Sequence, residues 1–512
     1  MLLLERTSAQ HHCAYPEQKH HMGVPGPGGV MRGCSRRAGR AARKRRQKCE
    51  CPIQSVSLCH QPQYVRLMKF LHRRGFTSAL LQPALFTDTG RGLQTLKTIK
   101  PGQLIVSLPA SCLLTTSTVL SSYLGHYIKS WKHRLSPLLV LCVYLVSERH
   151  RGETSDWFPY VDVLPTSYTC PAYFTQTVLA VLPADVQRRA LEQREALQEL
   201  HSSSQDFFRS LQPVLSQPAE EVFTYDAFRC SHTHTHTHTH TCMHTQYVSD
   251  SFFPTRWAWC SVNTRSVFMS HPCNHFLSGQ DVYALAPFLD LLNHQPDVQV
   301  KAGFSDVTGC YEIRSVSGTP RFQQAFINYG SHDNQRLLLE YGFVAPGNPH
   351  SVVYVDADLL CEVLKGDRSL NQKMKFLKEN DFVQNLTVSS DGPSWRLMTA
   401  LRLLSMPQTL YHQWRAVLLG QAVCEDGEEW SVLMAERLCQ RLLRDTHAAL
   451  DKISELLQQC DQSVREQLDV VHSLRQEETC LLGRCLEVLR GMMRRPEEEE
   501  LLPCQPDVDA VS

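Results

Sequence analysis

The sequence lacks a long hydrophobic run. Its longest apolar stretch, Leu135 to Val146, is shorter than the ~20 residues that a membrane-spanning helix needs. The first residues, MLLLERTSAQHH, contain no apolar segment long enough for a secretory signal. Leu2 stands where N-myristoylation requires glycine. We therefore expect no secretory signal, no N-myristoylation and no membrane partner.

The composition has no extreme feature either. Hydrophobic residues make up 42% and charged residues 20% of 512 residues, which excludes collagen-like, wholly disordered and purely coiled-coil chains. The 20 cysteines are scattered along the chain, so without a secretory signal we interpret them as reduced thiols. This interpretation predicts a protein of the nucleus and cytoplasm. At ~150 residues per domain, the length suggests three domains, or two with large insertions.

The net charge of +1 hides an uneven distribution. Residues 1–50 hold eleven Lys and Arg against three Glu, and nine of these basic residues lie between Arg32 and Lys48. Such a run can bind an importin or the phosphates of nucleic acid. A solvated, disordered tail explains the same residues, so both interpretations stay open.

Hydrophobic periodicity divides the rest of the chain. Alternating apolar residues over 87–109 predict strands joined by a turn at Pro101-Gly102. Residues 113–150 and 185–212 are typical of helices, and short strands are expected between Ala284 and Val344. From Val352 onward the chain is predicted to be mostly helical. Apolar residues at three-or-four spacing define one helical face there, namely Met434, Leu438, Leu442, Leu450, Ile453 and Leu457.

A strict dipeptide repeat, HTHTHTHTHT, occupies His232 to Thr241. An (AC)n microsatellite translates as alternating Thr and His, so we interpret residues 230–256 as an anomalous insertion. The alternative is a metal-binding histidine tract, since imidazole is a common metal ligand.

Three short stretches are candidates for chemistry. Thr89-Gly90-Arg91-Gly92 offers backbone groups that a ligand can approach closely, although Gly-x-Gly turns are common. Asp290 to His294 ends an apolar run with an Asn-His pair, which a locally capped turn would also explain. Tyr329 precedes Gly330, and Tyr341 follows shortly after; both phenols could equally be amphipathic core residues. Each stretch alone is weak.

In this order, however, the stretches resemble the SET domain of protein-lysine methyltransferases. Further segments are similar to the Rubisco large-subunit methyltransferase class within that family, and the resemblance covers about residues 60–490. These segments are SDWFPY (155–160), WAWC (257–260), NTR (263–265), YALAPFLDLLNH (283–294), DNQRLLLEYGFV (333–344) and DGPSWRLMTALRLL (391–404).

The resemblance implies an α+β fold in four parts. Residues 1–60 would be a basic, disordered arm, and residues 61–345 a SET catalytic domain with a helical insertion at about 115–265. Residues 346–495 would form a helical domain that helps to bind the protein substrate, and residues 496–512 an acidic tail. The Cys-rich zinc segment of other SET enzymes does not follow 341–349, so no metal is implied.

The resemblance also implies the cofactor and the roles of site residues. S-adenosyl-L-methionine would be the methyl donor, and Tyr329 the catalytic residue that orients the attacking amine. Asp290 and Tyr341 would line the lysine channel. The cofactor would be bound by Thr89, Gly90, Arg91, Gly92, Arg265, Asn293, His294 and Tyr329.

The implied activity is protein-lysine N-methylation, with histones as expected substrates and non-histone proteins also open. One alternative is a protein-histidine methyltransferase of the same class. Another is a non-catalytic, chromatin-associated adaptor that has kept the fold. The joint presence of Tyr329, Asn293, His294 and Arg265 argues against such a loss of activity.

Overall fold

The computed structural model describes residues 55–223, 254–365, 369–419 and 425–493. A β-rich part and the helices inserted into it share one hydrophobic core, and a C-terminal helical part has its own. A third cluster, which includes Phe174, Leu338, Ile453 and Val471, joins the two parts. This arrangement is the predicted α+β class. The basic segment Arg32–Lys48 and the repeat His232–Thr241 lie outside the described residues.

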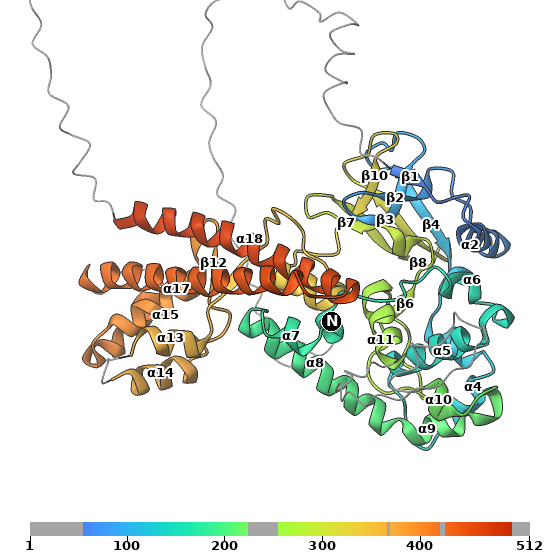
Figure 1. The fold of residues 1–512 in the computed structure, drawn as a ribbon, viewed down its shortest axis with the longest axis horizontal. Coiled ribbons are helices and arrows are strands. Elements are labelled where there is room, and N and C mark those ends of the chain that lie inside the picture. The colour runs from blue at the N-terminus through green and yellow to red at the C-terminus, as the bar shows by residue number, and fades with distance from the viewer. Residues whose placement is uncertain (1–54, 224–253, 366–368, 420–424, 494–512) are drawn as a thin grey trace, which may run out of the picture.

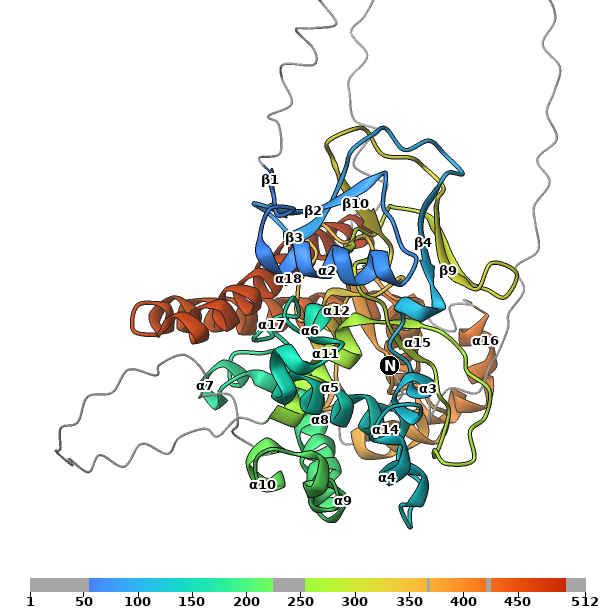
Figure 2. The ribbon, with the colours of Figure 1, turned by 90° about the vertical axis from the view of Figure 1, so that its right-hand side faces the viewer.

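The β-rich part contains two larger sheets that lie on the same side of the inserted helices (Figure 2). The first has the order β1 (Ser55–Ser57), β2 (Leu81–Phe86), β3 (Gly90–Thr95), β10 (Gln324–Ile327) and β7 (Asn293–His294). The second has the order β4 (Leu104–Pro109), β9 (Cys310–Ser315) and β8 (Val300–Ser305). A ribbon of β5 (Ser266–Phe268) and β6 (Tyr283–Leu285) completes this part, together with helix α2 (Pro62–Arg73). Because β1 begins at Ser55, ordered structure starts before the predicted boundary at residue 60.

All regular elements described between β4 and β5 are helical. They are α3 (Thr116–Leu120), α4 (Gly125–Ser130), α5 (Pro137–Arg151), α6 (Phe158–Val161), α7 (Gln176–Leu179), α8 (Ala184–Ser203), α9 (Gln205–Ser210), α10 (Ala219–Val222) and α11 (Pro254–Arg265), with short 3-10 turns between them. Helix α5 begins at Pro137, and the Ser136 hydroxyl accepts a hydrogen bond from the Leu139 amide. Its residues from Leu139 to Glu148 are buried on all faces. It is therefore the central helix of the insertion.

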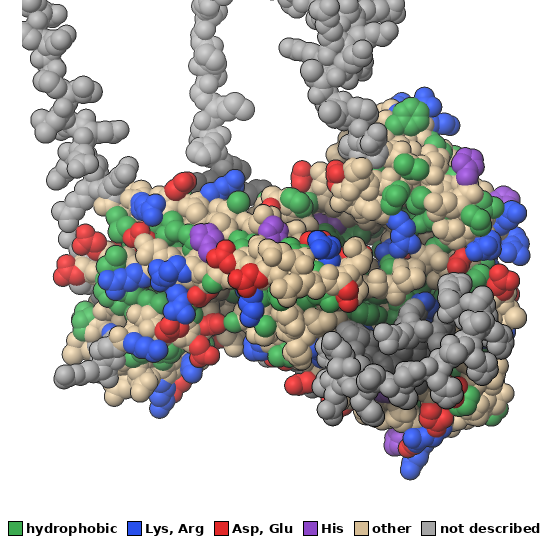
Figure 3. All heavy atoms as spheres, viewed as in Figure 1, with side chains coloured by type: hydrophobic (Ala, Val, Ile, Leu, Met, Phe, Trp, Pro, Cys, Tyr) green, Lys and Arg blue, Asp and Glu red, His purple; other side chains and the backbone are tan. Residues whose placement is uncertain are grey.

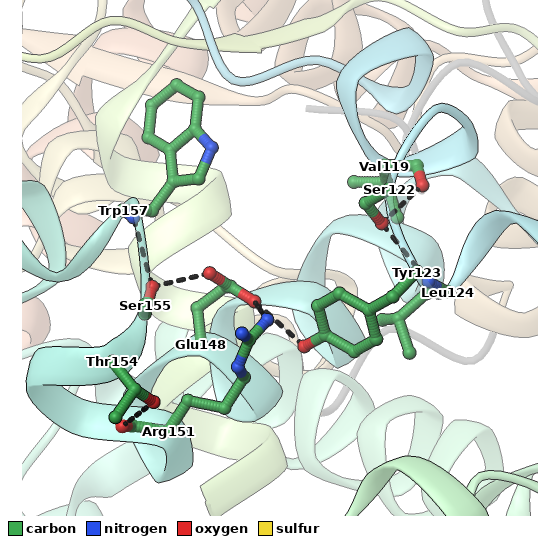
Figure 4. Close-up of polar contacts among 9 residues, drawn as sticks. All are labelled: Val119, Ser122, Tyr123, Leu124, Glu148, Arg151, Thr154, Ser155 and Trp157. Carbon is green, nitrogen blue, oxygen red and sulfur yellow. Dashed lines mark hydrogen bonds and ion pairs between the residues drawn. The ribbon is translucent and has the colours of Figure 1, made fainter.

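A buried carboxylate fixes the end of α5. Glu148 is 1% exposed, and its oxygens accept hydrogen bonds from the hydroxyl groups of Ser155 and, at 2.8 Å, Tyr123 (Figure 4). Arg151 adds an ion pair at 3.4 Å. These hydrogen bonds and the ion pair compensate for the loss of water around the Glu148 carboxylate. An acidic residue can therefore lie buried near the end of this helix.

The C-terminal part consists mainly of helices. They are α13 (Ala357–Val363), α14 (Leu370–Glu379), α15 (Trp395–Ser405), α16 (Trp414–Leu418), α17 (Glu425–Leu457) and α18 (Gln462–Met493). A small sheet of β11 (Val353–Tyr354), β12 (Thr387–Ser389) and β13 (Gly392–Pro393) packs beside them. The long helices α17 and α18 lie side by side and project away from the β-rich part (Figure 1). Met434, Leu438 and Ile453 are buried, as the predicted helical face requires.

One predicted boundary is wrong. The proposed insertion 230–256 ends inside α11, which begins at Pro254. Arg256 is buried, its guanidinium donates a hydrogen bond of 2.7 Å to the Ala172 carbonyl, and it lies 4.3 Å from the Tyr173 ring centroid. Arg256 therefore belongs to the fold of the helical insertion, and an anomalous segment must end before it.

Candidate active site

Strand β10 brings the three candidate stretches together. It pairs with β3 in antiparallel register, Gln324 opposite Gln94 and Ala325 opposite Leu93. On its other side it pairs with β7 in parallel register, Phe326 opposite Asn293. The glycine stretch, the Asn-His pair and the segment before Tyr329 are thus neighbours in one sheet, although about two hundred residues separate the first two.

Asn293 and Gly92 form a tight polar cradle. The Asn293 amide donates hydrogen bonds to the Arg91 carbonyl at 3.1 Å and to Gln324 Oε1 at 2.8 Å. A Cβ at Gly92 would lie 2.7 Å from Gln324 Oε1 and 3.0 Å from Asn293 Nδ2, so a side chain there would displace these two groups. Gln324 also bonds to the Thr89 hydroxyl at 2.8 Å. No local pattern in the sequence indicated Gln324, because its contacts are made across the sheet.

His294 is held in one protonation state. Its Nδ1 accepts a hydrogen bond of 3.1 Å from the Tyr329 amide, so in the neutral ring the proton sits on Nε2. Burial, with His332 and His350 nearby, lowers the pKa of His294 to about 4. The Nε2 atom is buried and has no hydrogen-bond partner among the described residues. His294 therefore offers an unused N–H donor.

Tyr329 lies at the centre of an aromatic cluster. Its hydroxyl donates a hydrogen bond of 2.7 Å to the Leu292 carbonyl. Its ring centroid lies 5.0 Å from that of Tyr341, 5.2 Å from that of His294 and 6.2 Å from that of Phe343. Burial raises the pKa of Tyr329, and the nearby Arg265 only partly offsets this effect. The phenol is therefore un-ionised at neutral pH.

Arg265 and Asp290 form a half-buried pair beside this cluster. Arg265 ends α11 and donates a hydrogen bond of 2.8 Å to the Asp290 carbonyl, and the Asp290 carboxylate lies 3.9 Å from its guanidinium. The Tyr160 hydroxyl donates to the same carboxylate at 3.1 Å. Burial raises the pKa of Asp290, and the attraction of Arg265 opposes this rise. Tyr160 lies within the quoted SDWFPY segment, but nothing in its local pattern indicated this contact.

A cavity of about 290 Å³ lies next to Tyr341 and is called the Tyr341 cavity below. Of the predicted site residues, Tyr341 alone lines it. Arg336 and Glu340, which also line it, form an ion pair of 3.0 Å. The other lining residues come from α5, α8, α11, α12 (Asn334–Tyr341), β5 and the start of β6; they include Leu138, Arg189, Glu192, Trp259, Asn263, Phe268 and Tyr283. Sequence reasoning missed these residues, because α8 and β5 meet only through packing.

Two other predictions concern metals and membranes. Within the described ranges, no group of three or more potential metal ligands occurs. His271, part of a Cys-His stretch that could imitate a metal site, bonds to the Tyr283 carbonyl at 3.0 Å. In the same part of the chain, no helix is long and apolar enough to cross a membrane.

Known proteins are similar to this chain in sequence. The mouse protein named SET domain-containing protein 4 is 44% identical over 462 residues, covering 90% of this chain and 99% of its own. The actin-histidine N-methyltransferase of Drosophila melanogaster is 26% identical over 297 residues, covering 58% and 51%. Residues 365–482 match the family described as Rubisco LSMT substrate-binding.

Solved structures of Rubisco LSMT resemble the fold. The structure bound to AdoMet has a TM-score of 0.53 and 17% identity, covering 84% of this chain and 92% of that chain. The structure bound to sinefungin and monomethyllysine also has a TM-score of 0.53, with 18% identity. At these identities, the likeness concerns the fold alone.

Proposed function

The chain belongs to the SET domain-containing protein 4 family, and from this premise we propose that it is a protein-lysine N-methyltransferase that acts on histones. Its class is that of the S-adenosyl-L-methionine-dependent SET methyltransferases, whose relatives modify lysine or histidine side chains of proteins. The choice of lysine and of histones is the proposal.

The residues present fit S-adenosyl-L-methionine. When bound, this cofactor supplies an electrophilic methyl group attached to a sulfonium sulfur. The Gly92 backbone lies close to the Asn293 amide, and the buried Nε2–H of His294 lacks an acceptor that a ligand could supply. The backbone of Thr89–Gly92, the side chains of Asn293 and His294, and Arg265 would hold the cofactor, with the Tyr329 ring beside it.

The aromatic cluster suits a lysine side chain. A free lysine has a pKa of ~10.4, so its ammonium group must lose a proton before it can attack. Burial among the rings of Tyr329, Tyr341 and Phe343 disfavours the charged form and lowers that pKa. The same rings can align the apolar stem of the side chain.

The hydrogen bond from the Tyr329 hydroxyl to the Leu292 carbonyl supports lysine rather than histidine as the methylated residue. Tyr329 donates its only hydroxyl hydrogen to the Leu292 carbonyl, so its oxygen can act toward a substrate only as an acceptor. A neutral amine nucleophile retains two N–H donors for this oxygen. The attacking nitrogen of a neutral imidazole carries no hydrogen, so it cannot donate a hydrogen bond to the Tyr329 oxygen. The similarity to an actin-histidine methyltransferase keeps histidine as the second candidate.

The test is the chemical identity of the methylated residue. Purified protein is incubated with recombinant core histones and S-adenosylmethionine labelled in its methyl group, and the histones are then hydrolysed to amino acids. We expect the label in Nε-methyllysine, with none in histones whose lysines were chemically acetylated beforehand. Label in methylhistidine would contradict the lysine assignment. Absence of label from the histones, while non-histone proteins of a cell lysate are labelled in a parallel reaction, would contradict the histone assignment.

We further propose that the protein occurs in nucleus and cytoplasm, and that Arg32–Lys48 contacts an importin or nucleic acid. The support is the density of positive charge in this segment. Deleting residues 1–50 should shift the protein toward the cytoplasm, as measured by fractionation, while its activity on a short peptide persists. Unchanged nuclear abundance would contradict this proposal.

A further inference from the structure

A second cavity, of about 390 Å³, lies where the SET part meets the C-terminal part; we call it the interlobe cavity. Its walls come from the start of α8, from α12 and α13, and from the long helices α17 and α18 (Figure 1). Its lining residues are Leu182–Asp185, Gln187, Gln335, Val353, Tyr354, Asp356, Asp358, Leu359, Glu362, Arg441, Leu442, Asp445, Thr446, Arg475 and Glu478. None of them belongs to the Tyr329 centre.

The interlobe cavity is acidic. Six carboxylate residues and two arginines line it. Arg441 forms ion pairs with Glu362 and Asp445, and Arg475 with Glu478, while Asp185 pairs with Arg188 and Arg189 outside the lining. Asp356 and Asp358 remain, exposed and without an ion pair among the described residues. Over the face drawn in Figure 3, acidic and basic side chains are mixed.

A buried acceptor in the wall gives a second, independent indication of a ligand. Gln335 is 2% exposed, and its amide nitrogen donates a hydrogen bond of 3.1 Å to Glu478. Its Oε1 atom is buried and has no partner among the described residues. A buried acceptor without a donor is unfavourable, so the site lacks a hydrogen-bond donor. The negative charge around it favours a donor that is a cation.

We propose that the interlobe cavity binds a lysine or arginine side chain of the protein substrate, at a position other than the methylated residue. This inference rests on the proposed function. Helices α8 and α12 border both cavities: Gln335 lines the interlobe cavity, and Tyr341 the Tyr341 cavity. Six residues of α12 span about 9 Å, and an extended chain covers that distance in about three residues. The second basic residue thus lies at least about three positions from the target.

The cavity would then select substrates by charge. A substrate that carries two basic residues at this spacing would be held at both cavities, whereas one with a single lysine would lose the second contact. The attraction is electrostatic and partly exposed, so it weakens as the ionic strength rises.

The test uses a probe that cannot be methylated on lysine. A fluorescent, end-blocked tetra-arginine peptide is titrated with the full chain, and anisotropy is measured at low and at physiological salt. The variant Asp356→Asn/Asp358→Asn removes two charges while Asn keeps the helix cap that Asp356 provides. The matched control is Asp306→Asn/Asp391→Asn, which removes two exposed carboxylates that lie outside the cavity.

We expect the Asp356/Asp358 variant to bind the peptide about tenfold more weakly, corresponding to about 1.4 kcal/mol, and the control to bind like the wild type. Gln335→Met should also weaken binding, and a tetra-citrulline peptide should not bind. Equal affinity of the Asp356/Asp358 variant and the control would overturn the assignment. Tighter binding after deletion of residues 1–50, seen only when Asp356 and Asp358 are present, would assign the cavity to the chain's own basic segment instead.

Methyl transfer separates this inference from the proposed function. With core histones as substrate, the Asp356/Asp358 variant should show a raised KM relative to the control variant. If the wild type transfers methyl groups and the Asp356/Asp358 variant has the same KM as the control variant, the interlobe assignment alone is overturned. Absence of methyl transfer by the wild type would overturn the proposed function, whatever the peptide binding shows.

Discussion

Replacing Tyr329 by phenylalanine removes one oxygen atom from the centre of the candidate site. The change deletes the hydrogen bond of 2.7 Å to the Leu292 carbonyl but keeps the ring that packs against Tyr341, His294 and Phe343. Loss of one buried hydrogen bond lowers the free energy of unfolding by about 1 kcal/mol. Loss of one positioned polar group at a reacting centre lowers the rate about a hundredfold, or ~3 kcal/mol. The variant should therefore still fold, but it should transfer methyl groups about a hundredfold more slowly than the wild type.

Three measurements separate these effects: the initial rate of methyl transfer to histones, the calorimetric Kd for S-adenosylmethionine, and the urea midpoint. The matched control is Tyr123→Phe, which also removes a phenol oxygen from a hydrogen bond, here of 2.8 Å to Glu148 of α5 (Figure 4). We expect both variants to lose a similar amount of stability and only Tyr329→Phe to lose rate. Wild-type turnover by Tyr329→Phe, or an equal loss of rate in the control, would refute this reasoning.

Further predictions address the cofactor cradle, a titrating histidine and the anomalous segment. Asn293→Ala removes the donor to the Arg91 carbonyl and should weaken S-adenosylmethionine binding in calorimetry. The control Asn380→Ala removes a donor to the Phe376 carbonyl of α14 and should leave this binding unchanged. Equal affinities of the two variants for the cofactor would contradict the assigned cradle. Because the pKa of His294 is lowered to about 4, the unfolded chain binds more protons than the folded one between pH ~6.5 and 4, and this contribution to stability is lost as the pH falls through that window. His294→Asn should therefore lose less stability than the wild type between pH 7 and 4.5 in urea titrations, and parallel curves would contradict the pKa assignment. A chain lacking residues 230–253 should melt at a higher temperature than one lacking 230–256, because the longer deletion also removes the bond of Arg256 to Ala172; the reverse order would show that Arg256 contributes nothing.

Local motifs predicted the parts of the site, and long-range packing supplied the rest. Gly92, Asn293, His294 and Tyr329 could be named from the sequence because their segments together, in this order, resemble the SET domain, although each segment alone is weak. The structure brings these segments to adjacent strands of one sheet. Whether they bind the cofactor stays a prediction until it is measured.

Other residues of the site had no local signature. Gln324 meets Thr89 across 235 positions of the sequence, and Tyr160 meets Asp290 across 130. The same reason explains the misplaced boundary at residue 256. Arg256 next to an unusual repeat looks like part of it, and only its contact with Ala172, 84 positions away, shows that it belongs to the fold. Such contacts depend on the tertiary arrangement and leave no periodicity.

The central claim is that the glycine stretch, the Asn-His pair and the Tyr329 turn form one cofactor site. Hydrogen–deuterium exchange of the full chain with and without S-adenosylmethionine tests it without any substrate. We predict slower exchange in peptides that cover Thr89–Gly92, Leu292–His294 and Asn328–Gly330, and no change in peptides of the central part of α17. Protection confined to other segments, or none at saturating cofactor, would contradict the claim.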